Sequence, residues 1–381
     1  MIYLDHAATS PPRRAVLEAA WPYLTAVTAN PASVHEPGRA ARAALEGARE
    51  RAAAVLGVRP GEVVFTSGGT EADNLAVLGI ARAAAAATGR RHVVTTAVEH
   101  AAVLEPARAL VREGFTLDVV GVDGDGVVDL DHLAAVLTDR TALCAVVHAN
   151  NEVGTVQPLA EVAALCRPLG VVLHTDAVQS AGQLPVRLDD LGVDSLAVSG
   201  HKLGGLRGAG LLAVRGAVPL EPVLHGGGQE RGRRSGTADV ASAVAAAAAL
   251  ALADAARPAE APRLTALRDR LLAGVLGLVP GARVTGHRTQ RLPNSASVVL
   301  PGVGGELVLA ELDAAGVVCS SGSACSAESE DASHVLTAMG LDADLARTAL
   351  RFSLGPETTA DDVDAVLALL PGVLAAAGPV R

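Results

Sequence analysis

Aromatic side chains are scarce in this sequence of 381 residues. Trp, Tyr and Phe together make up 2% of the chain, although half of its residues are hydrophobic. A chain of this composition can bury a large core, but that core must consist mainly of Ala, Val and Leu. The length suggests two or three domains.

An excess of positive charge is also absent, because 31 Lys and Arg stand against 41 Asp and Glu, a formal net charge of -10. Nucleic-acid-binding proteins usually carry a basic face, so we expect no direct nucleic-acid partner.

No basic segment precedes an apolar one at the start, so we expect no secretory signal. The most apolar stretch, Val240 to Ala253, is mainly alanine. A membrane span needs about 20 strongly apolar residues, which favours a buried helix and no membrane contact.

Cysteine is rare, with Cys144, Cys166, Cys319 and Cys325 the four in the chain, and none forms a CxxC pair. No spacing of Cys and His matches a metal site, so we predict no metal. Cys144 lies in an apolar strand pattern and Cys166 in a helical one, so we expect both to be buried and unreactive. We expect a reducing compartment, the cytoplasm.

One lysine stands between two apolar runs. Ser195 to Val198 precede the stretch Ser199–Lys202, and a glycine-rich turn then leads into Leu211 to Val214. This pattern predicts a strand, a tight loop and a second strand, and its glycines allow a bulky ligand to approach the backbone. A partly desolvated lysine can form a Schiff base with a carbonyl compound. Taken alone, Lys202 also fits a solvated position in an ordinary turn.

A second apolar run, Val171 to Leu173, ends in Asp176 and, three residues later, Gln179. Ligands of open α/β sheets collect at the carboxyl ends of strands. Enzymes that use pyridoxal 5'-phosphate (PLP) hold the pyridinium nitrogen of the cofactor with a carboxylate. This acid followed by a lysine resembles the fold-type I PLP enzymes. Motifs along nearly the whole chain are similar to those of the cysteine desulfurase family, in the class V aminotransferase group.

The strand pattern agrees with that resemblance. Apolar runs alternate with helical segments, which predicts a largely parallel sheet, with one antiparallel member near Lys202. The seven strand candidates begin near Val63, His92, Thr116, Ala142, Val171, Ser195 and Gly210. Further strands are expected at Ser297 to Leu300, Val317 to Cys319 and Ala349 to Ser353.

The resemblance implies an α/β fold-type I PLP-dependent transferase. We expect a large domain at 15–256 that carries the mostly parallel seven-stranded sheet. A smaller α+β domain, formed by 1–14 and 257–381, would carry a loop with Cys325. A helix from Val240 to Ala256 is expected to end at a domain connection that contains Pro258 and Pro262.

A phosphate site is predicted where the strand beginning near Val63 turns into a helix. Glycines precede that helix, and free N–H groups at a helix start bind anions, so Gly69 and Thr70 are the expected donors. Thr70 also fits a plain N-cap. The resemblance implies further roles around the cofactor: His100 stacks on the ring and shuttles protons, Gln179 bonds the ring hydroxyl oxygen, and Ser199 and His201 help to hold the phosphate.

The basic, glycine-rich loop from His225 to Thr237 is a second candidate for phosphate binding. By resemblance, Thr237 reaches the phosphate in a neighbouring subunit, which implies a homodimer. Asn151 would contact both cofactor and substrate. Arg351 would bind the substrate carboxylate, a group that suits the forked donors of an arginine. His6 fits a structural and a site role equally.

Cys325 lies in a small, polar stretch from Ser320 to His334. By resemblance this is the longer cysteine loop of the housekeeping branch, and Cys325 carries the sulfur. The family implies conversion of L-cysteine to L-alanine with a persulfide on Cys325. Iron–sulfur scaffold proteins or tRNA thiolation enzymes would accept the sulfur. Selenocysteine lyase and a non-catalytic sulfur-accepting scaffold remain alternatives, and the base that deprotonates Cys325 is open.

Overall fold

The computed structural model describes residues 1–321 and 332–378. Its largest sheet has seven strands in the order β2-β8-β7-β6-β5-β3-β4. Only β8 runs against its neighbours, pairing antiparallel with both β7 and β2, while the other pairs are parallel. The seven strands are β2 (Val63–Thr66), β3 (His92–Thr96), β4 (Thr116–Val120), β5 (Thr141–Ala145), β6 (Val172–Asp176), β7 (Ser195–Ser199) and β8 (Gly210–Val214).

All seven predicted strands are therefore confirmed, as is the antiparallel member next to Lys202. Five strands, β2, β3, β5, β7 and β8, are buried along their whole length, which explains why most of them read as nearly continuous apolar runs. β4 is exposed at most of its positions, as expected for a strand at the edge of a sheet.

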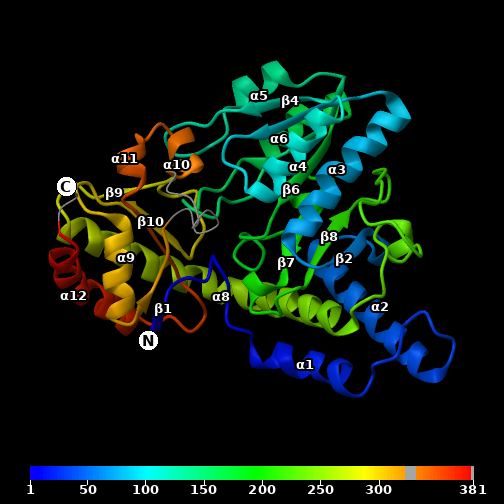
Figure 1. The fold of residues 1–381 in the computed structure, drawn as a ribbon, viewed down its shortest axis with the longest axis horizontal. Helices are drawn as coiled ribbons and strands as arrows, with labels where there is room; N and C mark the ends of the chain where they lie inside the picture. Colours follow the sequence, from blue (N-terminus) through cyan, green and yellow to red (C-terminus); the bar gives the residue numbers. More distant parts are fainter. Residues whose placement is uncertain (322–331, 379–381) are drawn as a thin grey trace.

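Helices cover both faces of this sheet (Figure 1). Two neighbouring residues of β5 show this. Leu143 packs in the core between the sheet and the helices α3 (Gly69–Thr88) and α4 (Ala101–Arg112), and Cys144 packs in the core on the other face of the sheet. The helices of these layers are α1 (Arg14–Thr25), α2 (Glu36–Leu56), α3 (Gly69–Thr88), α4 (Ala101–Arg112), α5 (Leu130–Val136), α6 (Leu159–Cys166), α7 (Leu188–Leu191) and the first half of α8 (Val240–Leu278).

A second core lies at the end of the molecule that holds both termini (Figure 1). Leu4 packs in it, although it comes from the start of the chain, because β1 pairs in parallel with β11. The other sheet here has the order β12-β10-β9. The elements are β1 (Ile2–Tyr3), β9 (Arg283–Val284), β10 (Ser295–Val299), α9 (Gly305–Ala314), β11 (Val317–Val318), α10 (His334–Ala338), α11 (Ala343–Ala346), β12 (Ala349–Ser353) and α12 (Ala360–Ala377).

The expected end of a helix at Ala256 is wrong. α8 continues through Pro258 and Pro262 to Leu278 and joins the two cores (Figure 1). Between Ala253 and Leu264 none of its residues is buried, so water can bond to the carbonyls that the two prolines leave without an N–H donor. The division of the chain into domains at 256/257 stays a prediction, and that boundary falls inside this continuous helix.

The buried side chains match the composition. The core is made almost entirely of Ala, Val and Leu, with Phe65, Phe115 and Phe352 as its aromatic members. Among the described helices, α8 alone is long and apolar enough to cross a membrane, but 61% of its most apolar window is buried inside the protein. We therefore describe α8 as a core helix. Cys144 and Cys166 are buried, as predicted.

Candidate active site

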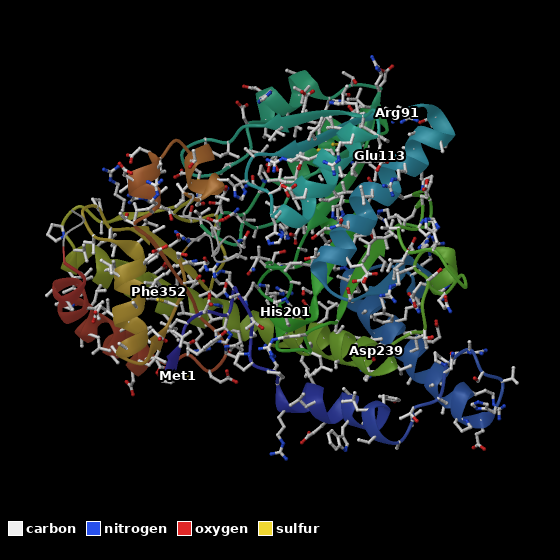
Figure 2. All side chains as sticks on the ribbon, viewed as in Figure 1. Met1, Arg91, Glu113, His201, Asp239 and Phe352 are labelled. Atoms are coloured by element: carbon white, nitrogen blue, oxygen red, sulfur yellow. The ribbon has the colours of Figure 1, made fainter. Side chains whose placement is uncertain are left out.

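A cavity of about 600 Å³ opens at the carboxyl ends of the central strands. Ten of the twelve predicted site residues line it, although they come from six separate segments of the chain. Figure 2 shows His201, one of the ten, near the middle of the molecule. The ten residues are Gly69, Thr70, His100, Asn151, Asp176, Gln179, Ser199, His201, Lys202 and Arg351.

Lys202 lies in a single 3₁₀ turn, Gly200–Leu203, directly after β7. The turn is tight: Gly204 has φ 74°, and a Cβ on Gly200 would lie 3.0 Å from the carbonyl oxygen of Ala209. Glycine tolerates both constraints. The Lys202 Nζ donates to the carbonyl oxygens of Ala7 at 2.5 Å and Ala8 at 2.6 Å. These acceptors hold the amine at the cavity wall.

The segment from Ala7 to Thr9 forms part of that wall. Besides holding Lys202, the Ala7 carbonyl accepts a bond from Gln179 Nε2 at 2.9 Å. The Thr9 hydroxyl lies 3.1 Å from His201 Nδ1. Sequence reasoning missed these contacts because the acceptors are mostly backbone carbonyls, which every residue type supplies.

Asp176 ends β6 and is buried at the cavity. Burial raises the pKa of its carboxyl, and His100, the Val178 N–H and Lys202 act in the opposite direction. One carboxylate oxygen accepts the Val178 N–H at 2.8 Å. An acid in this setting favours a cationic partner, such as a protonated ring nitrogen.

A second buried acid, Asp73, lines the same cavity and was not predicted. It is 1% exposed and lies 3.1 Å from His174 Nε2, while Nδ1 of that ring lies 2.9 Å from the Ser195 hydroxyl. Burial lowers the pKa of His174 to about 3, so the ring is neutral. Burial, with Asp176 nearby, raises the pKa of Asp73 well above its usual range. The contacts from Ser195 through His174 to Asp73 therefore fix the side chain of Asp73 near Asp176.

His100 is the N-cap of α4, and its Nδ1 accepts the N–H of Ala102 at 3.1 Å. A neutral ring bonded in this way carries its proton on Nε2. The cap fixes the imidazole at the cavity wall, where a flat ring can stack on a ligand.

The first turn of α3 brings N–H groups to the other end of the cavity. Gly69 lies tightly against the opposite wall, since a Cβ there would come 2.6 Å from Val178 Cγ2 and 3.3 Å from Ser199 Cβ. Ser199 and His201 line the cavity beside it. Burial, followed by the charges of Lys202 and Arg207, lowers the pKa of His201 to about 4. The arrangement of helix start, hydroxyl and imidazole suits an anion.

Arg351 lies in β12 and is only 2% exposed. Its guanidinium donates to Asp5 Oδ1 at 2.9 Å and to the Asn151 carbonyl at 2.9 Å. The Nε atom is buried and has no hydrogen-bond partner among the described residues. A substrate carboxylate that binds Arg351 would therefore share the guanidinium with Asp5. The sequence analysis did not single out Asp5.

Two of the candidates, Thr237 and His6, do not line this cavity. Thr237 lines a separate groove with the loop Asn30–Ala32 and with side chains of α2. Cys325 lies outside the described residues. His6 is buried next to Gly355 and lines a smaller cavity of about 40 Å³ that Gln179 and Lys202 also line, and burial lowers its pKa to about 4. Cys319 is partly buried, and burial raises its pKa to about 12.

The residues around the large cavity fit a phosphorylated, ring-shaped aldehyde such as PLP. The amine of Lys202, the acid Asp176 and the imidazole of His100 line one space with the glycine-led start of α3. The close approach at Gly69 leaves room there only for a residue without a side chain.

Comparisons with known proteins agree with this fold. The model of the class-V aminotransferase family matches residues 2–366, so the chain belongs to that family. Within it the chain groups with the cysteine desulfurases. It is 46% identical to an IscS-like cysteine desulfurase of Mycobacterium tuberculosis, covering 99% of this chain and 97% of the relative. It is 42% identical to the cysteine desulfurase IscS of Dictyoglomus turgidum, covering 98% and 94%.

Solved structures give the same result. A NifS-like protein superposes with a TM-score of 0.92 at 36% identity, covering 98% of this chain and 99% of that one. SspA in complex with cysteine superposes with a TM-score of 0.81 at 32% identity, covering 94% and 100%. The predictions of the family and of an α/β fold-type I arrangement are confirmed, and the family implies a PLP cofactor.

Proposed function

We propose that this protein is a PLP-dependent cysteine desulfurase that converts L-cysteine to L-alanine and takes the sulfur onto Cys325. The observation that carries the proposal is the single cavity that Lys202, Asp176, His100 and Arg351 share. When bound, PLP supplies an electron sink for bond cleavage next to the substrate nitrogen. The relatives and the solved complex with cysteine support this substrate class.

Each residue has a proposed task in that cavity. Asp176 pairs with the ring nitrogen of the cofactor, and Gly69, Thr70, Ser199 and His201 hold its phosphate. His100 stacks on the ring, and Gln179 bonds the ring hydroxyl oxygen. These contacts orient the cofactor before substrate enters.

Four residues act on the substrate. Arg351 and Asn151 orient the carboxylate of L-cysteine. The amine of Lys202 moves the proton from the α-carbon. The Cys325 thiolate then bonds to the substrate sulfur, the carbon–sulfur bond breaks with its electron pair left on carbon, and protonation of that carbon gives alanine. The thiolate matters because it is the nucleophilic form of cysteine.

We further propose a homodimer in the cytoplasm. Thr237 does not line the cavity that contains Lys202 of its own chain. This supports a role for Thr237 in the cavity of a second copy, where it would bind the cofactor phosphate. The persulfide would pass to an iron–sulfur scaffold or a tRNA thiolation enzyme.

The test is to incubate the pure protein with PLP and L-cysteine and to weigh the intact chain. We expect an added mass of one sulfur atom per chain. Lys202→Ala should lose the visible absorbance that PLP gains on bonding to a lysine. Cys325→Ser should keep that absorbance and gain no sulfur. Full sulfide release by Cys325→Ser, or release of selenium from L-selenocysteine in strong preference to sulfur from L-cysteine, would contradict the proposal.

A further inference from the structure

Two neighbouring residues in the loop from His225 to Thr237 have unusual backbone angles. Glu230 has φ 49° and Arg231 has φ 59°, and in the described chain every other residue with positive φ is a glycine. Side chains disfavour this left-handed region. The loop must therefore be held in this shape by contacts elsewhere.

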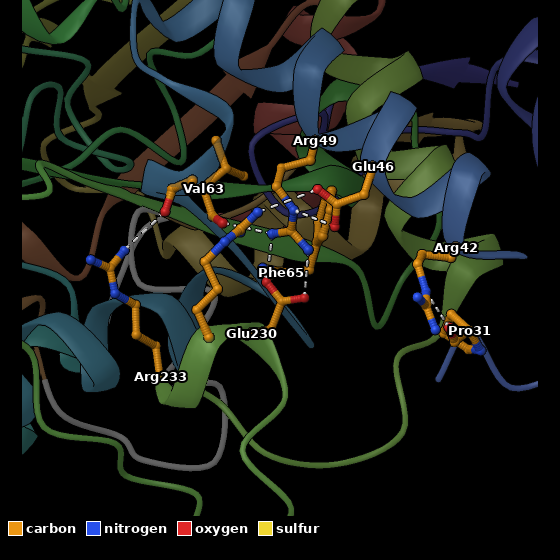
Figure 3. A network of polar contacts seen from close by, with 10 residues as sticks. Pro31, Arg42, Glu46, Arg49, Val63, Phe65, Glu230 and Arg233 are labelled. Atoms are coloured by element: carbon orange, nitrogen blue, oxygen red, sulfur yellow. Dashed lines mark hydrogen bonds and ion pairs between the residues drawn. The ribbon is translucent and has the colours of Figure 1, made fainter. Parts of the chain in front are cut away.

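A buried ion pair supplies those contacts (Figure 3). The two carboxylate oxygens of Glu230 accept bonds from Arg49 Nη1 at 2.7 Å and Nη2 at 2.8 Å, and one of them also accepts the Phe65 N–H at 3.0 Å. Arg49 also donates to the Val63 carbonyl at 2.7 Å and lies over the Phe65 ring. The side chains of Arg49 and Glu230 are only 2% and 6% exposed. The loop is thus fixed to α2 and to the edge strand β2.

The same loop has a second attachment, nearer to the cavity. Arg234 donates from Nε to Glu71 at 2.7 Å, and Glu71 stands in the first turn of α3. Glu71 also accepts the Ser67 N–H at 2.7 Å. Both attachments precede Thr237, and α8 begins at Val240 shortly after it, so the threonine is held between the fixed loop and the start of that helix. Glu230 and Thr237 also line the same groove.

We infer that Glu230 is a positioning residue: its buried pair with Arg49 holds the strained turn at 230–231, and that turn presents Thr237 to the cofactor phosphate of a second copy. The inference rests on the role of Thr237 under the proposed function. Glu230 itself does not line the cavity that contains Lys202, so it acts only through the loop.

The test measures how tightly the holoenzyme retains PLP, from its absorbance during dilution, together with dimer mass and thermal unfolding. Thr237→Ala should weaken retention about tenfold, the effect of one lost hydrogen bond to a charged group. Glu230→Gln should weaken it to a similar extent. The double variant should be no worse than either single variant, because both changes remove the same contact.

Glu46→Gln is the matched control, because it removes exposed contacts of the same network and leaves the buried pair in place. Glu46 contacts Arg49 and Arg231, each at 3.3 Å, through a side chain that is 42% exposed. Retention should therefore stay within about twofold of the wild type, as expected for an exposed pair. Arg231→Gly provides a rescue, because glycine adopts positive φ without strain. Added to Glu230→Gln, it should restore part of the lost retention.

The outcomes separate the two proposals. Unchanged retention in Thr237→Ala would contradict the role of Thr237 in the proposed function. Weak retention in Thr237→Ala with normal retention in Glu230→Gln would overturn the inference alone. Additive losses in the double variant, or a fall in thermal stability with no loss of retention, would also overturn it. If Glu230→Gln does not fold, Arg49→Lys, which keeps the charge but loses the forked geometry, replaces it with the same expectations.

Discussion

Arg351 is held by groups that a substrate would have to share. Its guanidinium is almost fully buried and already bonded to Asp5 and to the Asn151 carbonyl. A buried charge that loses its partner is costly, because water cannot replace the lost contact. Asp5 therefore serves both the stability of the fold and the orientation of the guanidinium.

Asp5→Ala should lower the free energy of unfolding by about 3 kcal/mol, the cost of leaving a buried charge without its partner. It should also raise the KM for L-cysteine, since the guanidinium is no longer fixed. Asp5→Asn keeps an acceptor oxygen and should cost less on both counts. Urea unfolding and saturation kinetics check this, and a wild-type unfolding midpoint for Asp5→Ala would contradict it.

Among the elements, α3 shows how a helix start can depend on a glycine. At Gly69 the first turn of the helix lies against Val178 and Ser199, and no space remains for a methyl group. Gly47, inside α2, is exposed and would have no atom within 4 Å of an added Cβ. A Gly→Ala substitution can therefore be compared at a position where the new methyl group meets other side chains and at one where it does not.

Gly69→Ala should destabilise the protein by about 1–3 kcal/mol through overpacking and should weaken retention of PLP. Gly47→Ala should instead stabilise it by about 0.5–1 kcal/mol, because alanine is the better helix former, and should leave PLP retention unchanged. Thermal unfolding and absorbance of the holoenzyme measure both effects. Equal behaviour of the two variants would mean that Gly69 is not part of the phosphate site.

α8 shows where local sequence signals fail. Pro258 and Pro262 predict the end of a helix, yet the helix passes through both. The apolar residues on either side of the prolines pack into two different cores, and this burial outweighs the loss of two backbone hydrogen bonds in an unburied stretch.

For the whole molecule, buried neutral histidines link stability to pH. His148 is 4% exposed, and burial lowers its pKa to about 4. In the unfolded chain a histidine titrates near its ordinary value of about 6.5. Between these values the unfolded chain binds a proton that the folded protein does not. The stability from His148 is therefore complete above pH 6.5 or so and is lost as the pH falls toward about 4.

His148→Gln removes this titration and leaves the backbone bonds of residue 148 to Asp176 and Gln157 in place. From about pH 7.5 to about pH 5 the wild type should lose roughly 2 kcal/mol more stability than the variant, at 1.36 kcal/mol per pH unit. Urea unfolding at the two pH values measures the difference. Parallel losses would show that His148 takes up its proton inside the fold.

Much of the fold could be predicted from the order of residues. Each of the seven strands is a short apolar run that local spacing reveals, and the carboxyl ends of β6 and β7 carry Asp176 and Lys202 to one edge. The glycine-led start of a helix predicted Gly69, and motif resemblance added His100 and Arg351; all three line the same cavity. The tasks of these residues stay predictions. So does the role of Cys325, which lies outside the described residues.

What the sequence by itself determined is the chemistry that the chain can offer: an amine, an acid, an imidazole and an arginine, each next to a strand or helix end that local patterns reveal. Only the tertiary structure decided their partners. The carbonyls of Ala7 and Ala8 hold Lys202, Asp5 holds Arg351, and Arg49 fixes the strained turn at Glu230. These contacts join residues far apart in the chain and depend on backbone atoms and burial, for which local sequence carries no signal.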